Sequence, residues 1–131
     1  MRRFGLVILL LLITGGSAFA SEQKDMYSMP CSTLWPAVKA TVSNSGYYAI
    51  VMIDNAEMAA SFAIGVGQGL RIESVVLNAK AGDSCEMQVQ PLYQPGLSND
   101  GNDFKKRVDA TMAYLKSAKE ASSTKPETTS K

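Results

Sequence analysis

Sulfur-bearing side chains give this sequence its clearest potential for chemistry. Met26, Met29 and Cys31 lie within a few residues of one another, and two thioethers beside a thiolate form a soft ligand set that suits Cu(I). The other cysteine, Cys85, lies much later in the chain. An even number of cysteines in an oxidising compartment favours a structural disulfide. We therefore predict a disulfide between Cys31 and Cys85, with Cu(I) binding as an alternative that requires a reduced Cys31.

Histidine is absent from the sequence, which bears directly on catalysis. Ser-His-Asp and Cys-His catalysis both require an imidazole, which is also the commonest zinc ligand. The carboxylates are expected in turns or on the polar sides of strands, where water solvates them. Those near the expected elements are Asp54, Glu57, Glu73, Asp83, Glu86, Asp100 and Asp103. No nucleophile and base converge in this pattern, so we predict a protein that is not an enzyme and has no cofactor.

The N-terminal segment has the composition of a secretory signal peptide. Arg2 and Arg3 precede an apolar run, and small residues follow it up to Ala20. This apolar run is too short to span a bilayer as a helix. We therefore expect residues 1–20 to be removed and the mature protein to be periplasmic or secreted.

The composition after this segment limits the classes of partner. Two of the 13 basic residues lie in segment 1–20 and none of the 12 acidic ones does, so the mature chain is nearly neutral. It offers no basic surface for nucleic acid, and no later run is long enough for a transmembrane helix. The length suits one domain, predicted at 21–117. Polar and small residues then dominate 118–131, which we expect to be a disordered tail.

Hydrophobic periodicity predicts the first regular element as a helix over 32–44. Leu34 and Val38 lie one turn apart and share an apolar face. Ser32 is a suitable N-cap, and a start that places Pro36 in the first turn is also compatible with the sequence. This segment is therefore expected to pack one face against the rest of the domain.

Four strands and a second helix are predicted after the first helix. The strands are expected at 47–53, 58–64, 70–79 and 85–91. The first of these strands is expected to be buried on one face, with one of its two adjacent tyrosines, Tyr47 and Tyr48, in the core. In the last strand Cys85 points inward. An apolar stripe from Phe104 to Leu115 predicts the second helix, capped by Asn102 or Asp103.

The simplest fold that buries both helical stripes is an α+β sandwich. It consists of a four-stranded antiparallel sheet with two helices packed on one face. The order of elements, with Leu34-Trp35, Gly46-Tyr47 and Phe104 at corresponding places, resembles the helix-grip domains of BamC-like envelope proteins. The resemblance covers about Met26 to Leu115. It implies a non-enzymatic accessory role in outer-membrane assembly, but the residue directly after the expected cleavage point is Ser21 and not the cysteine that would carry a lipid anchor.

We therefore expect an exported, non-enzymatic envelope protein that acts as a protein-interaction or assembly accessory module. Its partner would be an envelope protein that the sequence does not identify. A carrier for a small apolar ligand, held in the cleft between the sheet and the helices, is an alternative. A third hypothesis is Cu(I) binding by Met26, Met29 and Cys31. A filled core would favour the interaction module, and an open apolar cavity under the helices would favour the carrier.

Overall fold

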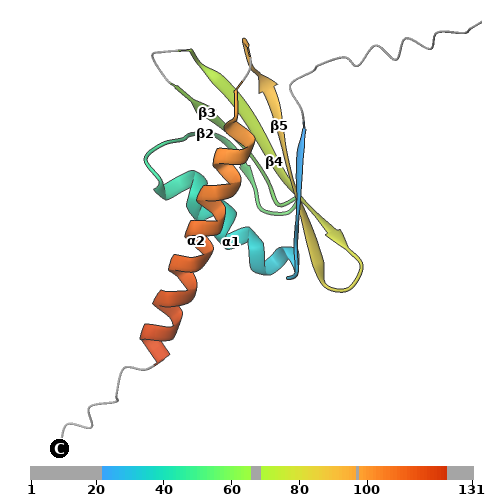
Figure 1. Cartoon of the computed structure of the whole chain (residues 1–131), viewed down its shortest axis with the longest axis vertical. Helices are drawn as coiled ribbons and strands as arrows, with labels where there is room; N and C mark the ends of the chain where they lie inside the picture. The colour runs from blue at the N-terminus through green and yellow to red at the C-terminus, as the bar shows by residue number, and fades with distance from the viewer. Residues whose placement is uncertain (1–21, 66–68, 97, 124–131) are drawn as a thin grey trace, which may run out of the picture.

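The computed structural model describes residues 22–65, 69–96 and 98–123 and has an α+β fold (Figure 1). The elements are β1 (Gln23–Tyr27), α1 (Cys31–Asn44), β2 (Ala49–Asp54), β3 (Ala59–Ile64), β4 (Arg71–Lys80), β5 (Ser84–Tyr93) and α2 (Asp100–Ser123). The predicted signal peptide, 1–20, lies outside the described residues, as does the end of the predicted tail, 124–131.

The sheet has five strands in the order β1-β5-β4-β3-β2, and all neighbouring strands are antiparallel. The prediction of four strands is therefore wrong, because β1 adds a fifth at the edge beside β5. Tyr27 of β1 pairs with Cys85 of β5. The sequence of β1 contains Gln, Lys and Asp, which are not typical of strands. Its strand conformation comes from pairing with a segment far away in the chain.

Both helices cover the same face of the sheet, and the α+β class with an antiparallel sheet is confirmed. Leu34 of α1, Val108 of α2 and Met87 of β5 belong to a single hydrophobic core. At the centre of this core, the rings of Phe62 on β3 and Phe104 on α2 are stacked with their centroids 4.8 Å apart. The helices are therefore held to the sheet by direct contact between buried side chains.

Helix α1 begins at Cys31, directly after Pro30, and Ser32 is not its N-cap. The extended backbone of Pro30 places its carbonyl oxygen where it accepts hydrogen bonds from the backbone N–H groups of Thr33 and Leu34. No side chain caps this end of the helix. A proline can precede the first turn because the N–H that it lacks has no partner there.

Helix α2 is longer than the apolar stripe predicts. It begins at Asp100 and continues to Ser123, so residues 118–123 are helical where the sequence analysis expects the start of a disordered tail. Alanine, lysine and glutamate in this segment have high intrinsic helix propensity, which extends the helix without core contacts. The second half of α2 projects beyond the sheet (Figure 1). Neither helix of the described chain is long and apolar enough to cross a membrane.

Candidate functional site

The two cysteines form a disulfide, which confirms the predicted pairing. Their Cα atoms are 4.9 Å apart. Cys31 is the first residue of α1, and Cys85 lies on the inner face of β5. The bond therefore attaches the uncapped start of α1 directly to the sheet. Closing a loop of this length stabilises a fold by about 4 kcal/mol in the chain-entropy model.

The same disulfide removes the thiolate from the predicted Cu(I) ligand set. Met26 is 58% exposed on β1, while Met29 packs against the hydrophobic core. Cys31, the third member of the set, is oxidised. In the described part of the chain, no group of three or more His, Cys, Asp or Glu side chains is placed to hold a metal ion. The methionines of this region therefore act in packing and at the surface.

The expectation that the carboxylates are solvated is wrong for Glu73 and Asp100, which are both buried. Glu73 lies on the inner face of β4, because it shares the strand's two-residue period with Val75 and Leu77 in the core. Its register partner on β3 is Phe62. The burial of Glu73 could have been predicted from the sequence, because strand alternation places residue 73 on the same face as residues 75 and 77.

Asp100 and Glu73 have very different surroundings. The Asp100 carboxylate accepts hydrogen bonds from Nε and Nη2 of Arg71 and, at 2.8 Å, from the Ser98 hydroxyl. Among the described residues, no donor hydrogen-bonds to the Glu73 carboxylate. Burial raises the pKa of Glu73 to about 7, and nearby Asp100 adds to the rise while Arg71 opposes it. Glu73 can therefore exchange a proton near neutral pH.

The tyrosine pair completes this polar end of the core. Tyr48 is buried and Tyr47 is 43% exposed, so one of the two lies in the core as predicted, although both precede β2 and neither is a strand residue. The Tyr48 ring lies 4.6 Å from Phe62 and 5.6 Å from Phe104, measured between centroids. Its hydroxyl is buried with no hydrogen-bond partner in the described structure, and burial raises its pKa. Tyr48 and Glu73 are therefore two buried titratable groups in this part of the core.

Strand β2 carries three consecutive exposed large apolar side chains. The sequence predicts that this strand is buried on one face, and this is wrong because residues 49–52, at the edge of the sheet, are all exposed. Ile50, Val51 and Met52 are 50%, 59% and 48% exposed, and we call these three residues the β2 edge patch. A register shift between Ile50 and Met52 marks a β-bulge. Large exposed apolar residues in a cluster are typical of interaction sites.

The backbone of β2 adds to this surface. One side of an edge strand carries N–H and C=O groups that are free to pair with another chain. Natural proteins often protect such edges with lysine or proline, and the run Ala49 to Ile53 contains no charged residue and no proline. Ile50 is paired with Phe62 and Met52 with Ser61, so their side chains lie on opposite faces of the sheet. An added strand can therefore contact apolar side chains on both of its faces.

Comparisons with known proteins do not identify a family. No family model and no curated protein match the sequence. Among solved structures, the crystal structure of Ara h 8.0201 is similar with a TM-score of 0.46 and 16% sequence identity, and the match covers 74% of this chain and 97% of that chain. A similarity at this level supports no inference about function.

Proposed function

We propose that this protein is an exported, non-enzymatic interaction module whose β2 edge binds an extended segment of an envelope protein. The β2 edge patch is the observation that carries the proposal. The partner segment would hydrogen-bond to the free backbone groups of β2 and place its alternate side chains against Ile50 on one face and Met52 on the other. Backbone pairing would supply affinity and the apolar contacts would supply specificity.

Two features of the structure support this function over the alternatives. The Cys31–Cys85 disulfide is typical of proteins that fold in an oxidising compartment, which supports export. The space between the sheet and the helices is occupied by fully buried side chains, including those of Leu34, Phe62 and Phe104. This filled core supports an interaction module over a carrier that uses the sheet-helix cleft.

The fold subtype and the kind of partner are part of the same proposal. Two helices on one face of an antiparallel sheet are consistent with a helix-grip arrangement, and the resemblance to BamC-like domains implies a partner in the envelope. An assembly accessory role would require reversible contact with incompletely folded chains. Extended segments of such chains have unpaired backbone groups, and an exposed strand edge can pair with them.

Site-specific photocrosslinking in intact cells tests the proposal. A photoreactive phenylalanine analogue at Val51 is compared with one at Leu92, which is similarly exposed at 57% but lies on β5. We expect a discrete crosslinked partner from position 51 and none from position 92. Ile50→Lys should reduce the product at position 51 by about fivefold or more, because a charge on the edge opposes strand addition. No product at position 51, or equal products at both positions, would contradict the proposal.

A further inference from the structure

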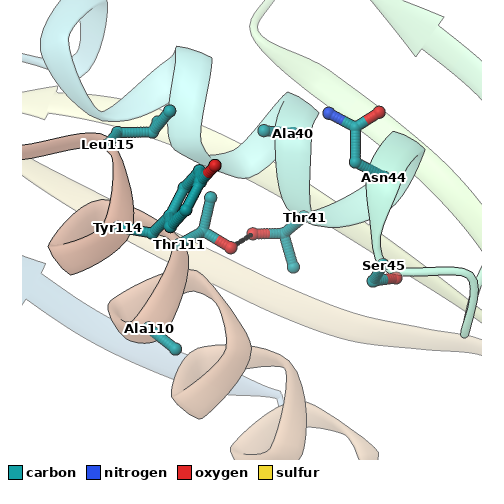
Figure 2. A pocket seen from close by; sticks show the side chains of 8 residues that line it. All are labelled: Ala40, Thr41, Asn44, Ser45, Ala110, Thr111, Tyr114 and Leu115. Atoms are coloured by element: carbon teal, nitrogen blue, oxygen red, sulfur yellow. Dashed lines mark hydrogen bonds between the residues drawn. The ribbon is translucent and has the colours of Figure 1, made fainter. Parts of the chain in front are cut away.

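The crossing of the two helices leaves unfilled space on both sides of α2. At the crossing, the Thr41 and Thr111 hydroxyls are joined by a 2.9 Å hydrogen bond, and the neighbouring side chains of Ala40 and Ala110 are small (Figure 2). Tyr114 extends from α2 toward α1 beside them (Figure 2). Small side chains do not fill the crevice between two helices, so a groove of about 350 Å³ opens on this side of α2.

A larger groove, of about 560 Å³, opens on the other side of α2. Its lining includes Met29 and Ala37 beside or on α1, and Asp109, Met112, Ala113, Lys116 and Lys119 on α2. We call this the helix groove. Its volume is in the range of sites that hold small molecules. The wall is mainly methyl, methylene and thioether groups, which favour an apolar occupant.

The charges at the rim of the helix groove are not balanced. Lys116 and Lys119 are exposed on successive turns of α2, and no carboxylate lies within ion-pair distance of either among the described residues. Asp109 also lines the groove, but its carboxylate accepts hydrogen bonds from Lys105 at 2.6 Å and from the Tyr27 hydroxyl at 2.8 Å. Within the described residues, the carboxylate of the groove is therefore paired while the two ammonium groups have no carboxylate partner.

We propose that the helix groove binds a single-chain amphiphile with an anionic head, such as a long-chain fatty carboxylate. The acyl chain lies against Met29, Ala37 and Met112, and the head group pairs with Lys116 and Lys119. Charge complementarity selects this occupant, since an apolar channel with free ammonium groups at its rim matches an apolar tail with one negative end. The site goes beyond the proposed function because it lies on different elements from the β2 edge.

Calorimetric titration of the mature chain with laurate, below its micelle concentration, tests the charge part of the proposal. We expect laurate to bind about tenfold more tightly than the cationic dodecyltrimethylammonium, as two exposed ion pairs would give. Lys116→Glu with Lys119→Glu should remove this preference. Lys80→Glu with Lys106→Glu changes the net charge equally, away from the groove, and should preserve it. Equal effects of the two double variants, or no preference for laurate, would overturn the proposal.

A matched pair of substitutions tests the location. Ala113 and Ala110 are both exposed on α2, but Ala113 lines the helix groove and Ala110 lines the smaller groove on the opposite side. Ala113→Trp should abolish laurate binding and Ala110→Trp should leave it unchanged, with circular dichroism showing that both fold. Laurate binding by Ala113→Trp would overturn the proposal. The proposal would also be overturned if the wild-type chain binds no laurate and instead forms a dimer that Ala113→Trp dissociates. Crosslinking from Val51 should be unaffected in both variants, which separates this test from that of the proposed function.

Discussion

Replacing Glu73 by glutamine tests whether this buried carboxyl controls the pH dependence of stability. Glutamine keeps nearly the same shape but cannot ionise. In the native protein Glu73 is 2% exposed. Burial makes its negative charge unfavourable, the nearby charge of Asp100 adds to this cost, and Arg71 reduces it. The substitution removes the cost of the buried negative charge and leaves the Arg71–Asp100 ion pair in place.

The free-energy cost of the buried Glu73 charge follows from the shift in its pKa between the unfolded and folded states. Folding raises the pKa of Glu73 from 4.5 to about 7, so the folded state holds its proton more strongly than the unfolded state. The stability contributed by this proton is fully present below pH 4.5 and is lost as the pH rises through about 7. One pKa unit corresponds to about 1.4 kcal/mol, so the native charge costs about 3 to 4 kcal/mol above neutral pH.

Denaturant unfolding with the disulfide intact measures this effect. We expect wild type and Glu73→Gln to be equally stable near pH 4, and the variant to be more stable by about 3 to 4 kcal/mol near pH 8. Glu57→Gln, at an exposed turn, makes the same change in net charge and should alter stability by less than about 0.5 kcal/mol. A difference for Glu73→Gln that does not change with pH, or a variant less stable than wild type near pH 8, would refute the reasoning.

Three further variants test the stability of the fold. Replacing Cys31 and Cys85 with alanine should lower the free energy of unfolding by about 2 to 5 kcal/mol in denaturant titrations, because it removes the disulfide that closes the loop between them. A loss below about 1 kcal/mol would contradict a stabilising role for the disulfide. Tyr48→Phe removes a buried hydroxyl without a partner and should raise the same free energy by about 1 kcal/mol, whereas a decrease would reveal a stabilising contact. Gly46→Ala should lower the free energy of unfolding by about 1 kcal/mol, and with it the melting temperature. Gly46 has a φ of +67°, a backbone conformation that alanine adopts only with strain. Nothing lies within 4 Å of the added methyl group, so an unchanged melting temperature would mean that the turn relaxes.

The features that the sequence determined by itself are those that depend on local patterns. The apolar stripes through Leu34 and Phe104 predict two helices, because residues three and four apart share a helical face. The alternation of β5 places Cys85 inward, and the even number of cysteines identifies its partner as Cys31. These patterns were sufficient for the α+β class and for the disulfide.

Only the tertiary structure decided which segments become neighbours. Strand β1 forms because it pairs with β5, although its own residues do not favour a strand. The apolar run in β2 has the composition of a buried strand, but its place in the strand order leaves Ile50 to Met52 exposed. Glu73 is buried because it lies on the inner face of β4, an inner strand of the sheet, and its raised pKa depends on that burial. The helix groove exists because α2 crosses α1 at small side chains. Each of these features depends on contacts between distant segments, which local periodicity does not specify.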